Sequence, residues 1–312
     1  MIIFREFSDI PKDENTFLTI GTFDGIHLGH KEILSKIITK AVRNGGRSFL
    51  ITFDPHPRSV LSKDSNVKIL TTLDEKSILL DLLGIQNLLI IKFTREFSQI
   101  SADDFVINYV LKFIGLKEIV IGHDHHFGKG RGGDENTLRE MGKEFDFNVT
   151  RVDAVNINGT SVSSTKIRNA LAEGNISLAN SFLGRYYSFH GNVVKGDGRG
   201  RLLGFPTANI KLKEENKLLP AIGIYAVELS VDNVKHFGLM SIGKRPTFYN
   251  DGQLTTEIYI FDFDKNIYDK NVIVKVVERI RGEEKYSSPE ELVAQMKKDK
   301  EAGMEIMSRL TN

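Results

Sequence analysis

The segment GTFDGIHLGH, from Gly21 to His30, combines three glycines with two imidazoles in a pattern that suits phosphate chemistry. It stands where a short apolar run ends and an amphipathic run begins, so we expect a strand to turn into a helix there. Glycine lets a backbone approach a ligand closely, and the first amides of a helix are donors that bind phosphate. Histidines beside those amides could stabilise negative charge that grows on a phosphate during its transfer.

This segment also has a simpler interpretation, because a glycine-rich turn with two histidines can be an ordinary strand-to-helix connection. It is neither a Walker A loop, which ends in Gly-Lys-Ser/Thr, nor a dinucleotide GxGxxG fingerprint. If it binds phosphate, its candidate residues are Gly21, Phe23, Asp24, Gly25 and Gly29 for the nucleotide, and His27 and His30 for catalysis.

The segment SSTKIR, at residues 163–168, is a second candidate for binding phosphates. Its hydroxyl groups lead into a predicted helix, whose first N–H groups favour anions, and its guanidinium can bind two phosphate oxygens at once. Taken alone, the segment fits more simply a serine-capped helix with exposed basic residues. Taken with the first segment, it predicts a triphosphate site that uses Ser163, Ser164, Thr165 and Lys166 for binding and Arg168 for catalysis.

Three histidines gather in the segment GHDHHFGKGRGGD, which begins at Gly122. His123, His125 and His126 raise the question of a metal site, but zinc sites need three or four ligands in a fixed geometry. No second set of histidines and carboxylates accompanies them in the sequence. We therefore do not expect a metal at this segment.

The segment KGDGRGRLLGFPTAN, at residues 195–209, is cationic and rich in glycine, as a flexible flap over a polyphosphate would be. Its end places a hydroxyl and an amide oxygen two residues apart, on one face of an extended chain, and Mg²⁺ prefers such oxygen ligands. Without other support, a solvent-exposed loop and a turn are the simpler interpretation. The candidates are Lys195, Gly196, Gly198 and Arg201 for the nucleotide, and Thr207 and Asn209 for the metal.

Glu257 supports the interpretation of the flap as part of a nucleotide and metal site. It is an acid that directly precedes the apolar run 258–261. Near a magnesium triphosphate, a carboxylate is the right group to accept a proton from a hydroxyl. The commoner situation is a strand carboxylate that only faces water. Glu257 is therefore the candidate catalytic base of the second half of the chain.

The first half of the chain must position the first two segments. Its short apolar runs, expected to be strands, are 17–23, 47–53, 87–93, 117–122 and 147–152, and helices are expected to begin near residues 30, 73, 102 and 135. Such alternation predicts an α/β domain with a Rossmann-like, doubly wound parallel sheet, which binds ligands at the carboxyl ends of its strands. Two short helices, 164–173 and 176–182, close this half.

The second half must position the flap and the acid. Its strand-like runs are 186–194, 223–231, 236–243, 255–263 and 271–280, with turns and no helices between them. This spacing predicts a small antiparallel barrel or sandwich. A helix from Pro289 to Arg309 follows, with Ser288 as its cap. We therefore predict two domains, residues 1–184 and 185–312.

The composition of the 312-residue chain excludes several classes of protein. Forty-two basic and 41 acidic residues leave a net charge of +1, and we see no basic-aromatic stripe, so nucleic-acid binding is not expected. The absence of cysteine excludes disulfides, thiolate catalysis and cysteine zinc sites. Neither a signal-peptide pattern at the start nor an apolar run of about 20 residues is present, so we expect a cytoplasmic protein without a membrane segment.

These motifs resemble a known enzyme family. GTFDGIHLGH and SSTKIR resemble the HxGH nucleotidyltransferases, and FDPHP at residues 53–57 with GHDHHFG is similar to the FAD synthetase module of bacterial riboflavin kinase/FAD synthetases. That module usually has Gly-x-Asp-Phe-x-Phe-Gly in its third motif. Here Asp124 and Phe127 match, so the resemblance implies that they contact the flavin, while His125 stands where phenylalanine is usual.

The second half resembles the riboflavin kinase module of the same family. The shared motifs are the glycine-rich flap, PTAN at residues 206–209, GIYAV at 223–227, SIGKRPTF at 241–248 and a glutamate in the next strand. Many relatives have histidine two residues after that glutamate, and this chain has Tyr259. The resemblance implies that Pro206 contacts the flavin and that Thr207 and Asn209 hold Mg²⁺.

The resemblance implies two successive reactions. The second domain would phosphorylate riboflavin with MgATP to give FMN, and the first would transfer AMP from ATP to FMN to give FAD and pyrophosphate. The expected ligands are thus flavins, ATP and Mg²⁺. Three alternatives stay open: a transferase that uses another phosphorylated acceptor, a chain that has kept one of the two activities, and a flavin-binding regulator without catalysis.

Overall fold

The structure is a computed structural model that describes residues 1–62, 67–196, 198–244 and 254–311. The chain divides into two compact units, Met1–Ser164 and Thr165–Asn312. This division groups the helical residues after Ser164 with the second unit. The domain boundary after residue 184 stays a prediction.

The first unit is built on a parallel sheet, as predicted. Its six strands have the order β1-β4-β3-β2-β5-β6. Their bounds are β1 Ile2–Phe4, β2 Thr16–Ile20, β3 Arg47–Asp54, β4 Asn87–Lys92, β5 Glu118–Gly122 and β6 Asn148–Val152. The strand β1 was not predicted, because it has three residues and its isoleucines are exposed at the edge of the sheet.

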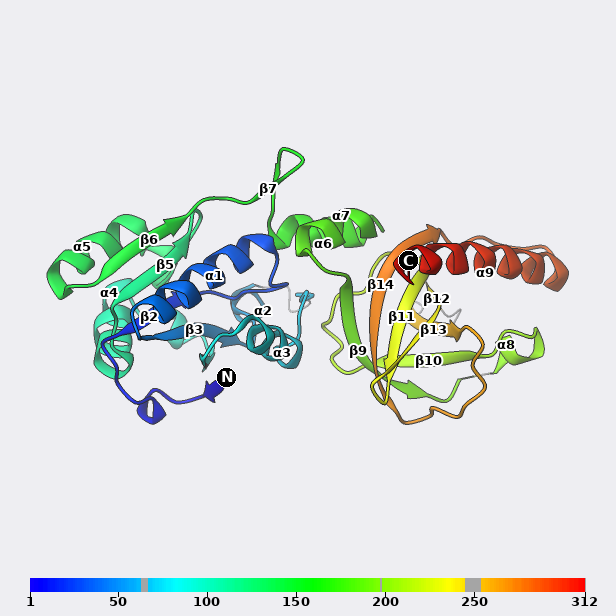
Figure 1. Ribbon diagram of the computed structural model, residues 1–312, viewed down its shortest axis with the longest axis horizontal. Helices are drawn as coiled ribbons and strands as arrows, with labels where there is room; N and C mark the ends of the chain where they lie inside the picture. The colour runs from blue at the N-terminus through cyan, green and yellow to red at the C-terminus, as the bar shows by residue number, and fades with distance from the viewer. Residues whose placement is uncertain (63–66, 197, 245–253, 312) are drawn as a thin grey trace. The chain divides into compact units, whose positions relative to one another are not determined.

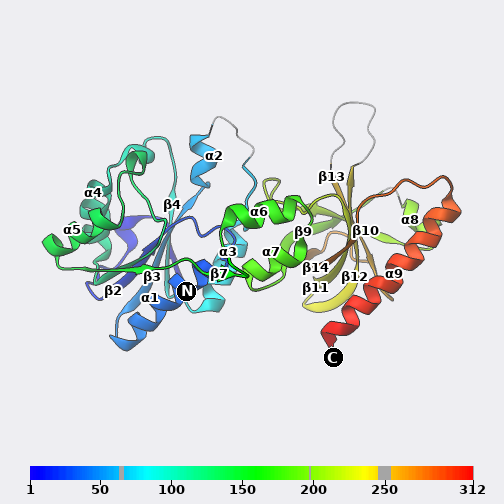
Figure 2. The ribbon, with the colours of Figure 1, turned by 90° about the horizontal axis from the view of Figure 1, so that it is seen from above.

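Helices cover both faces of this sheet. On one face, α1 (Leu28–Arg43) and α3 (Leu73–Leu83) bury Leu34, Ile37 and Leu80 against the strands. On the other face lie α4 (Ala102–Phe105), its π-helical continuation Val106–Ile114, and α5 (Glu135–Phe145). Figure 2 shows α1 and α4 on opposite sides of the sheet.

Short elements complete the first unit. They are the helix α2 (Pro57–Leu61), the 3-10 turns Phe7–Asp9, Phe97–Gln99 and Lys129–Arg131, and the hairpin of β7 (Asn156–Ile157) and β8 (Thr160–Ser161).

The chain order creates a switch point beside β2. β2 pairs with β3 on one side and with β5 on the other, although the chain visits β3 and β4 before β5. Ligands of doubly wound sheets bind at the carboxyl ends of the strands at such a point. The segment GTFDGIHLGH follows β2, and the histidine segment follows β5. Both segments therefore leave the sheet at the expected place.

The second unit contains a closed antiparallel barrel, also as predicted. Its strands have the order β10-β13-β12-β11-β14-β9. Their bounds are β9 Tyr187–Val194, β10 Thr207–Leu212, β11 Gly223–Val231, β12 Val234–Lys244, β13 Leu254–Ile260 and β14 Asn271–Arg281. β10 was not predicted as a strand, because PTAN resembles a turn. The flap contains one helical turn, α8 (Arg199–Leu202), where we expected only a loop.

The predicted C-terminal helix is α9 (Pro289–Thr311), which crosses the outside of the barrel (Figure 1). Ser288 caps it, since its Oγ accepts a hydrogen bond of 3.2 Å from the amide of Glu291. Ile306 and Met307 pack on Ala226 of β11. The helix is also held by Asp299, which accepts hydrogen bonds from Arg281 of β14.

The helix α7 (Ile176–Leu183) packs on β9 and β14, and α6 (Ser164–Ala172) precedes it. The amide of Ala221 donates to the carbonyl of Leu171 at 2.9 Å, and the side-chain amide of Asn180 donates to the carbonyls of Val276 and Val277 in β14. These bonds attach both helices to strands and turns of the second unit. Within the described residues, no helix is long and apolar enough to cross a membrane.

Candidate active sites

The glycines of GTFDGIHLGH make room for side chains of the same loop. A Cβ at Gly29 would lie 3.3 Å from the ring of His27, and a Cβ at Gly21 would lie 3.1 Å from the ring of Phe23. Gly25 has a φ of +90°, which side chains rarely allow. We predicted these glycines from their ability to approach a ligand; the structure shows that they first make room for the rings of their own loop.

The two histidines of this segment lie together at the start of α1. Their rings stack with centroids 3.6 Å apart. His27 is the N-cap residue of α1, and its Nδ1 accepts a hydrogen bond of 3.3 Å from the amide of His30. An accepting Nδ1 places the proton of the neutral ring on Nε2, which makes Nε2 the donor. The arrangement thus offers imidazole donors beside a helix N-terminus.

Asp24 connects the loop between β2 and α1 to the residues that precede α3. Its buried carboxylate accepts hydrogen bonds from the amides of Leu70 and Thr71, at 2.9 Å each, and from the hydroxyl of Thr71. The same hydroxyl accepts from the amide of Gly25 at 3.0 Å. Asp24 therefore supports the loop, and its predicted contact with a nucleotide stays a prediction.

The segment SSTKIR is divided between the two units. Ser164 belongs to the first unit, and its hydroxyl donates to the carbonyl of Asp24 at 2.8 Å. Thr165, Lys166 and Arg168 lie on α6 in the second unit. The structure thus joins Ser164 to the first motif. The phosphate contacts of the other three residues stay predictions, as does that of Ser163.

The segment after β5 packs on the core of the first unit through Phe127. The ring of Phe127 stacks on His125 with centroids 5.5 Å apart and contacts Phe105 in the core. Asp124 is exposed, and its carboxylate lies 3.9 Å from Nδ1 of His123. In the described part of the chain, no group of three or more His, Asp or Glu residues could hold a metal ion.

In the barrel, the register of three strands aligns the predicted kinase residues. Glu257 of β13 pairs with Asn209 of β10 on one side and with Ser241 of β12 on the other. Directly opposite residues project to the same face of a sheet. The hydroxyl of Thr207 donates to Oε2 of Glu257 at 2.9 Å. The predicted base and both predicted metal ligands therefore gather on one half-buried patch of the barrel.

The flap contacts this patch through its glycines. A Cβ at Gly196 would overlap the side-chain amide of Asn209, and one at Gly200 would lie 3.4 Å from the hydroxyl of Thr207. Residue 197 and residues 245–253 lie outside the described residues, so part of the flap and of SIGKRPTF cannot be placed. The remaining predicted flap residues, Lys195, Gly198, Arg201 and Pro206, are exposed.

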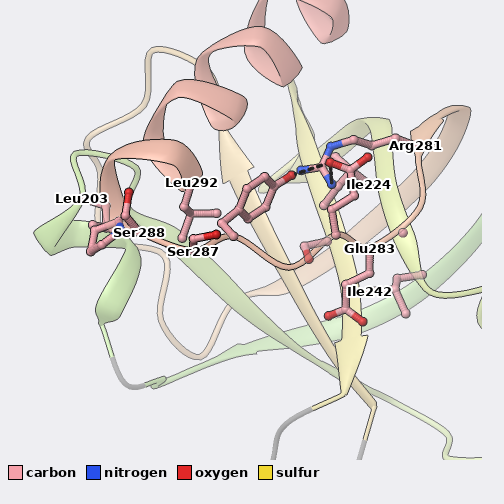
Figure 3. A pocket seen from close by; sticks show the side chains of 13 residues that line it. Leu203, Ile224, Ile242, Arg281, Glu283, Ser287, Ser288 and Leu292 are labelled. Atoms are coloured by element: carbon pink, nitrogen blue, oxygen red, sulfur yellow. Dashed lines mark hydrogen bonds and ion pairs between the residues drawn. The ribbon is translucent and has the colours of Figure 1, made fainter.

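A cavity of about 540 Å³ opens in the second unit (Figure 3). Ile224, Ile242 and Leu292 give it apolar walls. Ser241, the residue that pairs with Glu257, also lines it, and Arg281 lies at one side. The wall formed by residues 283–289 was missed from the sequence, where a polar stretch between the last strand and the helix was its only signal.

Lys76 is a second residue that the sequence analysis missed. Its side chain is 6% exposed, although lysine is rarely buried unless it is paired. The signal was present, because Lys76 interrupts the apolar stripe of α3 between Leu73 and Leu80. Its Nζ donates to the carbonyl of Thr22 at 2.7 Å.

Comparisons with known proteins match both halves of the chain. A family model described as FAD synthetase matches residues 9–166, and one described as riboflavin kinase matches residues 183–307. The bifunctional riboflavin kinase/FMN adenylyltransferase of Listeria monocytogenes is 38% identical, over 96% of this chain and 94% of that protein. The enzyme of the same name from Escherichia coli K12 is 34% identical, over 95% and 93%.

A solved structure has the same arrangement of elements. It is titled as a macrolide-efflux protein from Streptococcus pneumoniae, is 31% identical and superposes with a TM-score of 0.89, over 97% of this chain and 98% of that one. The motifs and the near full-length relatives agree on both halves. The chain belongs to the family of bifunctional riboflavin kinase/FMN adenylyltransferases.

Proposed function

We propose that Glu257 is the catalytic base of the riboflavin kinase reaction. The acceptor is a primary hydroxyl group, which is protonated at neutral pH, so its attack on the γ-phosphate of ATP requires a group that takes the proton. Glu257 is half-buried, pairs with Ser241, which lines the cavity, and accepts a hydrogen bond from the hydroxyl of Thr207. The alignment of Asn209, Glu257 and Ser241 across three strands is the observation that carries this proposal.

Thr207 and Asn209 would hold Mg²⁺ in this site. The residues fit the ion, because a hydroxyl, an amide oxygen and a nearby carboxylate are the hard oxygen ligands that Mg²⁺ prefers. When bound, the ion would neutralise charge on the phosphates of ATP. The flap residues Lys195, Gly196, Gly198 and Arg201 would cover those phosphates, as the glycine contact with Asn209 supports.

The cavity beside Ser241 would bind the isoalloxazine ring of riboflavin. Its volume of about 540 Å³ lies in the range of pockets for molecules of this size. Its isoleucine and leucine walls suit an aromatic ring, and Arg281 and the serines offer polar contacts at the edge. A flavin held there would direct its ribityl chain toward Glu257. Pro206, the flavin contact implied by the motif, belongs to the same proposal.

In the first unit, His27 and His30 would stabilise the transfer of AMP to FMN. The nucleophile is the phosphate of FMN, which is mostly ionised at neutral pH because its second pKa is about 6. No strong base is needed. The stacked imidazoles and the start of α1 supply donors, which is what the crowded phosphates and the departing pyrophosphate require.

The other residues of this proposal rest on the motifs. Gly21, Phe23, Gly25 and Gly29 shape the loop, and Ser163, Ser164, Thr165, Lys166 and Arg168 would bind phosphates. Asp124 and Phe127 would contact the flavin of FMN, since they follow β5 at the switch point of the sheet. Both reactions consume ATP, so we propose the cytoplasm as the compartment and small molecules as the partners.

Two single variants of the full chain test the assignment. Purified protein is given riboflavin, ATP and Mg²⁺, or FMN, ATP and Mg²⁺, and the products are separated by chromatography over time. Glu257→Gln should slow FMN formation on the order of 10²-fold or more and leave the FMN-to-FAD step unchanged. His30→Gln should do the reverse, with a loss on the order of 10²-fold in the adenylyl step.

Glu228→Gln is the matched control for the base. Glu228 is another strand glutamate of the barrel, bound to Lys275 at 2.8 Å, and it should keep both activities. If Glu257→Gln forms FMN at the rate of the parent chain, Glu257 is not the base. If the unchanged chain performs only one of the two conversions, the alternative of a single retained activity holds.

A further inference from the structure

The loop between β2 and α1 has a strained backbone. Phe23 has a φ of +46° and Ile26 a φ of +38°. Positive φ values are uncommon for residues other than glycine, and they are outliers for β-branched residues such as isoleucine. Such conformations persist only where the surrounding structure holds them in place. Because His27 directly follows Ile26, any relaxation of this loop would move the imidazoles.

The buried side chain of Lys76 binds this loop from the interior of the unit. Its Nζ donates to the carbonyl oxygen of Thr22 at 2.7 Å and contacts the hydroxyl oxygen of Thr52 at 3.3 Å. The hydroxyl of Thr52 also donates to the carbonyl of Thr22, at 3.2 Å. One carbonyl of the strained loop thus accepts two donors inside the unit. The carbonyl oxygen of Thr22 is therefore directed toward the ammonium group of Lys76 in the interior of the unit.

The carboxylates that act on Lys76 belong to two of the motifs found in the sequence. Burial lowers the pKa of Lys76, and the carboxylates of Asp24 and Asp54 oppose that effect. Asp24 belongs to the loop after β2, and Asp54 ends β3 at the start of FDPHP. A buried cation near Asp24 and Asp54 would be costly to keep if it served only the packing of α3, where leucine would fit.

We propose that Lys76 is a positioning residue for adenylyl transfer: it fixes the strained loop at residues 22–26 and thereby sets where His27 and His30 meet the phosphates. This inference rests on the proposed role of the two histidines. It does not require Lys76 to touch a substrate. It predicts that loss of the ammonium slows turnover in the first unit and leaves the kinase reaction of the second unit intact.

The test is Lys76→Met in the full chain, which keeps an unbranched side chain and removes the donor. We expect kcat for FAD formation from FMN and ATP to fall at least 10-fold, with a smaller change in KM. The riboflavin kinase rate, measured on the same sample, should stay within twofold of the parent chain. Lys76→Gln, which retains an N–H donor, should lose less than Lys76→Met.

Hydrogen exchange provides a readout that a purely structural role would not move. In Lys76→Met, amides of residues 21–27 should exchange faster, while those of β3 and β4 keep their protection. Lys40→Met is the matched control, because Lys40 lies in the same unit, on α1, and binds Glu118 and Thr150 away from the loop. It should keep the rate of adenylyl transfer.

Three results would overturn the proposal. One is an unchanged kcat for FAD formation in Lys76→Met. The second is equal loss in Lys76→Gln and Lys76→Met. The third is faster exchange throughout the sheet with loss of activity only in proportion to unfolded protein. If the parent chain itself forms no FAD from FMN, the proposed function fails instead, and that result is visible before any variant is compared.

Discussion

His125 differs from the usual phenylalanine of its motif, and the structure gives that difference a physical cost. Among the described side chains, its Nε2 is buried and makes no hydrogen bond. Burial lowers the pKa of His125 from 6.5 to about 4, so the ring is neutral at pH 7. An unsatisfied buried polar atom typically costs about 1–3 kcal/mol of stability. The ring stacks on Phe127, so phenylalanine has the shape to replace it.

His125→Phe should therefore change the stability of the first unit and its dependence on pH. At pH 7 we expect a higher Tm, because the unpaired nitrogen is gone. The unfolded chain binds a proton at His125 below about 6.5, whereas the folded chain does so only near 4, so stability falls as the pH is lowered through this window. The variant should lose that part of the acid sensitivity.

The measurement is thermal unfolding of the parent chain and of His125→Phe at several pH values between 4 and 8. His123→Phe is the control, since His123 is exposed in the same segment. A parent and a variant with parallel curves of Tm against pH would contradict the assigned role of burial.

At the scale of elements, one ion pair connects the end of β14 to α9. Arg281 donates to both carboxylate oxygens of Asp299, at 2.7, 2.9 and 3.2 Å, and these hydrogen bonds raise the pKa of Arg281. The carboxylate is buried. Arg281 also lines the cavity beside Ser241. The pair thus fixes a wall of the proposed riboflavin pocket to the helix that crosses the barrel.

Asp299→Asn should loosen this wall. Removing one charge of a buried pair costs about 3–5 kcal/mol in other proteins, and an amide that still accepts one bond should cost less. We expect a lower Tm for the second unit and a KM for riboflavin raised at least fivefold, with a smaller change in KM for ATP. The control is Lys298→Ala, a change of the exposed neighbour on α9. Equal KM values for riboflavin in Asp299→Asn and the parent would show that the ion pair does not shape the riboflavin pocket.

The sequence predicted the elements with strong patterns and missed those with weak ones. Buried parallel strands such as β3 are continuous apolar runs, and their alternation with helices determines the order of the layers. β1 and β10 were missed because the first is a three-residue edge strand and the second has polar residues on a half-buried face. The π-helical turns after α4 have no signal of their own in periodicity.

The candidate sites were predictable as motifs, and their geometry was not. The sequence shows Glu257 and Asn209, but only the pairing register places them opposite each other. It shows the glycines near His27, but not that Gly29 makes room for its ring. The hydrogen bond from Lys76 to the carbonyl of Thr22 joins residues 54 positions apart, which no local pattern reveals. Contacts between distant segments are fixed by tertiary packing, so a single sequence cannot display them.

At the scale of the whole molecule, the boundary between the two halves depends on whether α6 and α7 fold with the barrel. α7 packs on β9 and β14, and Asn180 bonds to β14 and to the amide of Tyr187. Arg279 of β14 donates to the carbonyl of Glu173, between the two helices. A domain that begins after residue 184, as we predicted, would lack these partners. A unit that begins at Thr165 would keep them.

Fragments 165–312 and 185–312 distinguish these two boundaries. We expect the longer fragment to have the higher Tm, by roughly 5 °C or more, since it retains the buried side chains of α7 against the barrel. It should also convert riboflavin to FMN at a higher rate per molecule. Calorimetry and the chromatographic assay measure both quantities. Equal Tm values would support the boundary after residue 184.

The closure of the barrel has a consequence for the order of events at the ribosome. The strand β9 pairs with β14, whose last residue is Arg281, and the wall of the cavity continues to Leu292. A nascent chain that has already released the whole parallel sheet still lacks the last strand of the barrel. Because domains fold as they emerge, we expect the parallel sheet and the loop with the two histidines to form before the barrel can close. The half of the chain for the second reaction is therefore expected to fold before the half for the first.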